Sequence, residues 1–349
     1  ITPAELYDYY KVYYEEVNAI NRELQPQVPL EVGGPGLMQY DESWMYALLD
    51  RYVADPSPDK RLDFISWHAY GEFPEGTGDS SGPRAYHFYN GNPSEGAGHR
   101  NLLNEALASR GLDTIIPAFL TETGIYPGPS SDNPDDPRPD YLIGAAGVPA
   151  LHYWLMETPD TYPFNWVVRH SGEERKDQLI SRARNGEHIA VKGDENLEDL
   201  PINTFSPYGN AMAMMAKLKK ERVVSQSDAL KDGIGIYSIA TKDEYGAGVM
   251  VWNYQHIGQR SYDVTIDMGK LPANLRGTQL CQRMYRIDDE VSNYWANPES
   301  ANLQQVAATS IAPTERHSVS VQLTPNALQL IVLEPGQDCA SLPAGKEGL

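Results

Sequence analysis

Four runs of mostly apolar residues, each ending in glycine, polar or aromatic residues, constrain the fold of this chain most strongly. Segments with the spacing of amphipathic helices separate them, so strand and helix alternate along the first part of the chain. Nearly continuous apolar runs are typical of parallel strands that are buried on both faces. The expected strands cover residues 28–36, 62–71, 114–122 and 148–157.

The chain opens with a helix signal. Thr2 and Glu5 form a capping-box pattern around Pro3, and the apolar residues that follow recur at spacings of three and four. This predicts a helix with one buried face, made by Leu6, Tyr10, Tyr13, Val17, Ile20 and Leu24. The expected helices cover residues 3–24, 42–53, 101–111, 140–146 and 205–223.

The periodicity changes in the second part of the chain. Between residues 230 and 335, apolar and polar residues alternate in short runs that turn residues separate, which predicts an antiparallel β-sandwich. Residues 336–349 form a tail with few core residues. The chain is therefore expected to be an α/β domain over residues 1–225 followed by a β-sandwich.

The charge balance excludes several classes of partner. Twenty-eight lysine and arginine residues oppose 48 aspartate and glutamate residues, giving a net charge of -20 that repels phosphates and anionic membranes. No run approaches the roughly 20 apolar residues of a membrane helix. We therefore expect neither nucleic acid nor a membrane as partner. Cys281 and Cys339 could form one disulfide in an oxidising compartment, or remain two free thiols.

Candidate functional residues lie where the expected strands end, because α/β barrels carry their chemistry at the carboxyl ends of strands. Glu122 follows a buried run in the sequence TETG, which favours a catalytic carboxylate over a simple ion pair. His68 fits a site residue and a core histidine equally well. Adjacent strand positions face opposite ways, so if His68 faces the site, Trp67 packs against helices. The other strand-end residues are Tyr70, His152, Trp154 and Glu157.

Motifs of other mechanisms are absent from the sequence. It has no G-x-S-x-G nucleophile elbow, no H-E-x-x-H zinc helix and no phosphate-binding G-x-x-x-x-G-K-[ST] loop. We therefore expect no metal and no cofactor.

The segments LEVGGPG, DFISWHAYG, AFLTETG and ALHYW, followed by SPYGNAMAMM and MYRIDDEVSN, resemble a known family. They are similar to the last four strands, last helix and sandwich of clan A glycoside hydrolases, most of all family 39, which includes β-xylosidases and α-L-iduronidases. The resemblance implies the C-terminal half of a (β/α)8 TIM barrel followed by an accessory β-sandwich. It also implies retaining hydrolysis through two glutamates.

The resemblance assigns roles to particular residues. Glu122 matches the nucleophile at the end of strand seven, His68 and Tyr70 match the H-x-Y of strand six, and Trp154 matches the aromatic residue of strand eight. The family's acid/base glutamate lies in an N-E-P segment that this sequence lacks. Glu157 is the only substitute within the chain that we consider. A full barrel takes roughly 250 residues, so an N-terminal half-barrel polypeptide or fragment is expected as partner.

The substrate is open at this stage. Arg169 belongs to a basic cluster within residues 167–188 that could bind a uronate or sulfate, but interleaved acidic residues favour a solvated loop. The substrate is expected to be a carbohydrate with β-glycosidic bonds, and the protein secreted or periplasmic. The alternatives are an agar-type galactan hydrolase of the same clan and a noncatalytic carbohydrate-binding relic that lacks the acid/base.

Overall fold

A computed structural model describes most of the chain in two compact units, which we treat separately. The described residues are 1–70, 92–124, 142–166, 168, 179–180, 204–255, 260–294, 296–336 and 339. The first unit comprises residues 1–72, 93–124 and 151–166. The second comprises residues 73–92, 125–150 and 167–349.

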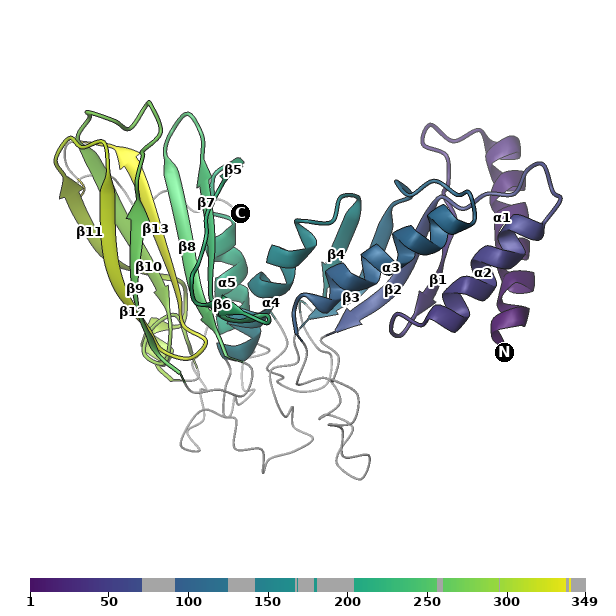
Figure 1. Ribbon diagram of the computed structural model, residues 1–349, viewed down its shortest axis with the longest axis horizontal. Coiled ribbons are helices and arrows are strands. Elements are labelled where there is room, and N and C mark those ends of the chain that lie inside the picture. The colour runs from purple at the N-terminus through teal and green to yellow at the C-terminus, as the bar shows by residue number, and fades with distance from the viewer. Residues whose placement is uncertain are drawn as a thin grey trace, which may run out of the picture. The chain divides into compact units, whose positions relative to one another are not determined.

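The first unit is built on a parallel four-stranded sheet in the order β1–β2–β3–β4 (Figure 1). Helices connect the strands, as the alternating pattern of the sequence predicts. The strands are β1 (Gly33–Leu37), β2 (Phe64–Tyr70), β3 (Ala118–Gly124) and β4 (Thr161–Asn165). The helices are α1 (Pro3–Leu24), α2 (Glu42–Ala54), α3 (Glu95–Ser109) and α4 (Leu142–Leu155), of which α4 enters this unit at Leu151.

Helix α1 confirms the capping box but not its expected buried face. Thr2 accepts from the backbone N–H of Glu5, whose carboxylate accepts from the N–H of Thr2. Leu24 and Tyr13 are 68% and 66% exposed. Of the expected face, Tyr10 alone is fully buried, and the other buried side chains of the helix are Tyr7 and Tyr14.

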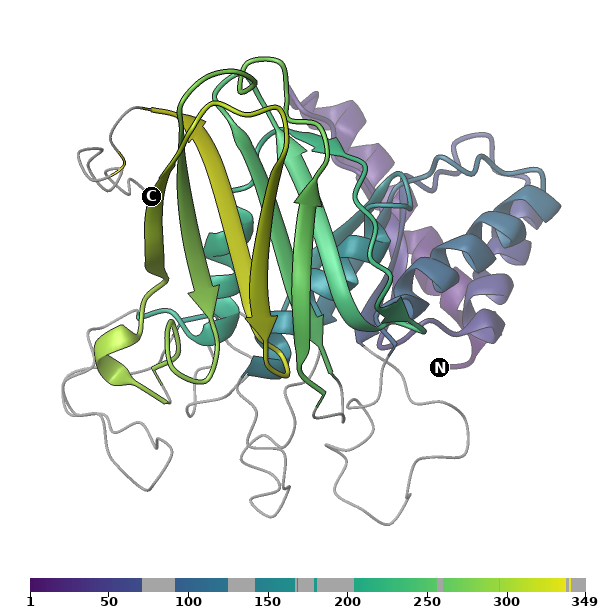
Figure 2. The same cartoon turned by 60° about the vertical axis from the view of Figure 1, so that its left-hand side comes forward.

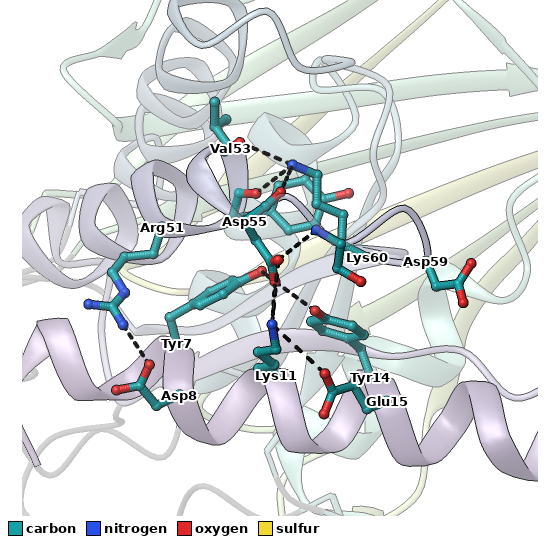
Figure 3. A network of polar contacts seen from close by, with 12 residues as sticks. Tyr7, Asp8, Lys11, Tyr14, Glu15, Arg51, Val53, Asp55, Asp59 and Lys60 are labelled. Atoms are coloured by element: carbon teal, nitrogen blue, oxygen red, sulfur yellow. Dashed lines mark hydrogen bonds and ion pairs between the residues drawn. The ribbon is translucent and has the colours of Figure 1, made fainter.

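Asp55, directly after α2, explains this choice of face (Figure 3). The Tyr7 and Tyr14 hydroxyls both donate to its Oδ2 atom, at 2.8 and 2.6 Å, and Lys11 Nζ lies 3.4 Å from the same oxygen. The N–H of Ser57 donates to Oδ1. The hydrogen bond from Tyr14 is the largest influence that holds the pKa of Asp55 far below its usual range, against the effect of burial. The helix therefore buries a face made of tyrosines, whereas the periodicity predicted a face that also contains aliphatic residues.

The strand expected over residues 148–157 is wrong, because those residues belong to helix α4 and the turn after it. The run LIGAAGVPALHYWL is apolar all round, and periodicity cannot distinguish a buried helix from a buried strand in such a run. Pro149 lies inside the helix. The fourth strand is β4, whose sequence TYPFN comes later in the chain.

Strand β1 begins later than the expected run over residues 28–36, at Gly33. Gly33 pairs with Phe64 of β2, and a Cβ atom at Gly33 would overlap the carbonyl oxygen of Phe64. The close pairing of these strands therefore requires a glycine, so the glycine pair belongs to the strand rather than to a turn after it.

The second unit contains antiparallel sheets that follow helix α5 (Figure 2). One has the order β11–β10–β13–β8–β7–β5, with β6 also on β7, and a two-stranded sheet pairs β12 with β9. Both contribute to one core, in which Ile266 and Leu323 lie with Val249, Val251 and Ile331. The elements are α5 (Pro207–Met215), β5 (Glu221–Val223), β6 (Leu230–Lys231), β7 (Ile234–Lys242), β8 (Ala247–Tyr254), β9 (Tyr262–Met268), β10 (Leu280–Ile287), η2 (Pro298–Ser300), β11 (Gln304–Ile311), β12 (His317–Leu323) and β13 (Leu328–Pro335).

The helix expected over residues 205–223 is too long, because α5 ends at Met215. The basic residues after it lead into β5, which pairs with β7. Asn210 joins α5 to the loop after β10, since its Nδ2 atom donates to the carbonyl oxygens of Ser292 and Ala301 at 2.8 and 2.6 Å.

A disulfide joins Cys281 of β10 to Cys339, with 5.2 Å between their Cα atoms. Of the two alternatives that the sequence left open, the structure therefore has the bonded pair. Within the described part of the chain, no helix has both the length and the apolar character needed to cross a membrane.

Candidate active site

The carboxyl ends of β2 and β3 bring His68 and Glu122 together. Nδ1 of His68 lies 3.3 Å from Oε2 of Glu122, and the two residues are register partners in the parallel pair. Their side chains are 22% and 26% exposed. Glu122 is therefore held in one direction by an imidazole yet remains accessible to a ligand.

An extra residue in β3 determines which way Glu122 points. Trp67 pairs with Leu120, and the next residue of β2, His68, pairs with Glu122. Strand β3 therefore advances by two residues where β2 advances by one. The same shift occurs against β4. Leu120 pairs with Pro163 and Thr123 pairs with Asn165, so β3 again has one residue more than its neighbour between the two pairs. In a regular strand Glu122 would face the same side as buried Leu120, because side chains alternate. The bulge instead turns Glu122 to the side of His68, as bulges near active sites commonly do.

The sheet face that carries His68 also carries aromatic rings. The ring of Phe119 lies 5.0 Å from that of Phe64, 5.7 Å from Tyr162 and 5.9 Å from Phe164, measured between centroids. Tyr162 and Phe164 are 48% and 55% exposed. Parallel sheets are normally covered on both faces, so an aromatic face with this exposure is fit to receive another layer or a ligand.

The opposite face is buried, and Trp67 belongs to it. Trp67 is fully buried, and its ring meets the edge of Tyr40 at 5.5 Å, while Tyr40 stacks on His99 of α3. This agrees with the expectation that Trp67 packs against helices when His68 faces the site.

A polar network on the buried side joins the ends of β3 and β4. The hydroxyl of Thr123 donates to Oδ1 of Asn165 at 3.2 Å, and Nε2 of His152 lies 2.9 Å from the same oxygen. Because an amide oxygen only accepts, Nε2 carries the proton. Burial lowers the pKa of His152, and the bond to Asn165 opposes the shift. His152 is therefore neutral and holds Asn165, which precedes Trp166. Asn165 in turn accepts from Thr123, which follows Glu122.

The other residues predicted for the site lie elsewhere or outside the described part of the chain. Tyr70 is the last residue of β2, but its side chain lies outside the described part, as does Arg169. Trp154 lies on α4 and not on a strand, which corrects its position as the strand-eight aromatic residue. Glu157 is exposed in the turn that precedes β4. It therefore lies toward the amino end of that strand, whereas Glu122 lies toward the carboxyl end of β3.

Trp166 is an exposed aromatic residue beside the site that the sequence did not reveal. It follows β4 directly, its N–H donates to the carbonyl oxygen of Thr123 at 2.8 Å, and it is 37% exposed. In the alternation of β4 it follows exposed Tyr162 and Phe164. The alternating aromatics of TYPFNW were the available signal.

The described residues contain no group of three or more His, Cys, Asp or Glu side chains that could hold a metal ion. The paired Glu122 and His68 beside the half-exposed rings of Tyr162 and Phe164 offer an oriented carboxylate on an aromatic surface.

Solved structures share this fold. A monomeric β-xylosidase from Caulobacter crescentus CB15 matches with a TM-score of 0.63 and 15% identity, over 94% of this chain and 66% of its own. The GH39 enzyme from Xanthomonas axonopodis pv. citri matches with a TM-score of 0.58 and 14% identity, over 95% and 64%. The bacterial orthologue of human α-L-iduronidase matches with a TM-score of 0.61 and 13% identity, over 95% and 59%.

The resemblance to family 39 of clan A glycoside hydrolases therefore holds for the fold, which combines a parallel sheet with antiparallel sheets. The chain spans about two thirds or less of the length of these structures. No family model matches the sequence, and no curated protein does.

Proposed function

We propose that this chain is the C-terminal part of a retaining glycoside hydrolase in which Glu122 is the nucleophile. The pair of Glu122 and His68, 3.3 Å apart at the carboxyl ends of neighbouring parallel strands, carries the proposal. Reactive groups of (β/α)8 barrels lie at that end of the strands. The similarity in fold to a β-xylosidase and an α-L-iduronidase points to the same chemistry.

In this proposal β1 to β4 are strands five to eight of a (β/α)8 barrel. The half-exposed aromatic face, with Tyr162 and Phe164, then forms part of the barrel interior, and the other half of the barrel covers it. Residues 1–225 would be the barrel part, residues 230–335 an accessory β-sandwich, and residues 336–349 a tail. The partner is an N-terminal half-barrel polypeptide or segment.

The mechanism is a double displacement. Glu122 attacks the anomeric carbon, and a second carboxylic acid about 5 to 5.5 Å away protonates the leaving oxygen and then activates water. That acid comes from the N-terminal half, because Glu157 lies toward the amino end of its strand. His68 keeps the attacking oxygen of Glu122 in one orientation. Trp166 offers a flat ring on which a sugar can pack.

The substrate is proposed to be a poly- or oligosaccharide with β-glycosidic bonds, with β-xylosides as the first to test. The structure with a TM-score of 0.63 is a β-xylosidase, which supports that choice. The disulfide between Cys281 and Cys339 supports an exported protein, secreted or periplasmic, because such bonds persist in oxidising compartments.

Hydrolysis of aryl glycosides by the protein together with its N-terminal half tests the proposal. The panel contains aryl β-xyloside, β-galactoside and α-iduronide, with agarose as the polymer. Glu122→Gln should lower kcat at least a thousandfold with unchanged circular dichroism. Glu105→Gln, an exposed glutamate of α3, is the matched control and should keep the wild-type rate.

The results of these assays distinguish the proposed hydrolase from the two alternatives. Cleavage of agarose alone would favour the galactan hydrolase. A complete, folded protein that binds these sugars but cleaves none of them would point to the noncatalytic relic. Full activity in Glu122→Gln would refute the assignment of the nucleophile.

A further inference from the structure

Thr123, Asn165 and His152 form a polar group on the buried side of the sheet, at the carboxyl ends of β3 and β4. The hydroxyl of Thr123 and Nε2 of His152 lie 3.2 and 2.9 Å from Oδ1 of Asn165. Thr123 directly follows Glu122, and Asn165 directly precedes Trp166. The group therefore adjoins the candidate site through the backbone, on the face away from His68.

The bulge in β3 determines which side of the sheet Thr123 faces. Leu120 and Thr123 are three residues apart, so in a regular strand their side chains would point to opposite faces. Both are 0% exposed, because the extra residue between them reverses the alternation. The same extra residue turns Glu122 toward His68. The bond from Thr123 to Asn165 and the direction of Glu122 therefore depend on one irregularity of the backbone.

The backbone at the bulge is held from β4 only after Glu122. The paired residues of β3 pass from Leu120 directly to Thr123, so Glu122 has no register partner in β4. Two hydrogen bonds then hold Thr123. Its hydroxyl donates to Asn165, and its carbonyl oxygen accepts from the N–H of Trp166 at 2.8 Å. Because an extra residue disrupts the ladder of a sheet, these bonds are what keeps the residue after Glu122 in place.

His152 holds the amide of Asn165 in turn. The N–H of His152 and the hydroxyl of Thr123 both donate to Oδ1, so the amide cannot turn over without losing two hydrogen bonds in a largely buried place. His152 belongs to helix α4. A side chain on a helix, locked by packing and hydrogen bonds, fixes a neighbouring group more precisely than a loop does. The helix thus anchors the end of β3 through one amide oxygen.

We propose that Thr123, Asn165 and His152 are positioning residues that hold the bulge of β3 and so keep Glu122 directed at its target. The inference rests on the proposed function, in which Glu122 attacks the anomeric carbon. A displacement of about 1 Å at a reacting group lowers a rate about a hundredfold. Loosening the bulge therefore lowers kcat, whereas KM changes little because the three side chains do not bind the sugar.

Thr123→Val tests this, because it removes the hydroxyl and keeps the shape of the side chain. In the protein together with its N-terminal half, kcat for the aryl glycoside that the wild type cleaves fastest should fall about 10- to 100-fold, with KM changed less than about threefold. Thr123→Ser keeps the hydroxyl and should recover most of the rate.

The matched control is Thr158→Val. Thr158 is 7% exposed and donates to the carbonyl oxygen of Leu155 at 2.7 Å, in the turn before β4. This variant also removes a hydrogen bond of a buried threonine, but at the amino end of the sheet, and it should keep the wild-type kcat. An equal fall of kcat in both valine variants would overturn the proposal, since loss of stability alone would then explain it.

Combining Thr123→Val with His152→Leu gives a second measurement. Both changes act through the same amide oxygen, so the double variant should lose about as much kcat as the more impaired single variant. Losses that multiply would mean independent effects and would count against the network. His152→Gln, which still donates to Asn165, should keep most of the rate that His152→Leu loses.

Crystal structures of the wild type and Thr123→Val distinguish this inference from the proposed function. Nδ1 of His68 lies 3.3 Å from Oε2 of Glu122 in the wild type, and in the variant this distance should exceed the limit of about 4 Å for an ion pair. An unmoved pair or an unchanged kcat overturns the positioning role, and the proposed function stands if Glu122→Gln is inactive. A displaced pair in a protein whose wild type cleaves no glycoside keeps the positioning role and removes the proposed function.

Discussion

Replacing Asp55 by alanine should destabilise the packing of α1 on α2 more than any exposed change on those helices. Asp55 is buried, and it accepts from the hydroxyls of Tyr7 and Tyr14, which are 3% and 0% exposed. In Asp55→Ala both hydroxyls lose a charged acceptor in a place that water reaches poorly. Hydrogen bonds to charged groups contribute about 1.5 to 3 kcal/mol each. The variant no longer buries a charged carboxylate, and this offsets part of the cost. The net loss in the free energy of unfolding is therefore about 3 kcal/mol.

Amide hydrogen exchange in the middle of α2 is the suitable assay, because a protein with two units need not unfold in one step. A loss of about 3 kcal/mol corresponds to roughly a hundredfold faster exchange at Leu48 and Leu49. The control is Asp8→Ala, which removes an exposed ion pair with Arg51 and should cost about 1 kcal/mol or less. Equal acceleration by the two variants would refute the reasoning.

The same network predicts a dependence on pH. The pKa of Asp55 is lower in the folded protein than in the unfolded chain. Its contribution to stability is therefore complete above the unfolded value of about 3.9 and is lost as the pH falls toward the folded value. The difference in exchange between the wild type and Asp55→Ala should accordingly shrink below about pH 4. A difference that stays constant down to pH 2 would contradict this.

Three further predictions concern other parts of the fold. Gly33→Ala should separate β1 from β2 and speed amide exchange in β2, at a cost of about 1 to 3 kcal/mol, whereas Gly34→Ala, whose Cβ atom would meet its nearest neighbour at 3.9 Å, should cost less. Cys339→Ser opens a link of 58 residues and should cost the second unit about 2 to 4 kcal/mol in urea unfolding; equal midpoints for the reduced and oxidised wild type would contradict this. His152 has a lowered pKa, so the unfolded chain binds more protons and stability should fall as the pH drops from 7 to 5. His152→Gln, which can still donate to Asn165, should flatten that fall, and an unchanged slope would count against the neutral histidine.

Much of this protein follows from its sequence. The capping box at Thr2 and Glu5 determined where α1 begins, because the groups that satisfy the first helix turn are local. The apolar runs before His68 and Glu122 identified β2 and β3, since parallel strands buried on both faces need little else. Alternating residues after position 230 likewise predicted the antiparallel strands.

Only the tertiary structure decided the rest. Helix α4 and a buried strand look alike in sequence, because both are apolar throughout, so the sequence did not reveal where β4 and the exposed Trp166 after it lie. The bulge at Thr121 has no local signal, yet it decides whether Glu122 faces the helices or His68. Successive side chains of a strand point to opposite faces of the sheet, so one extra residue reverses the face of every side chain that follows it. The sequence thus named the carboxylate, while the register against two neighbouring strands decided where it points.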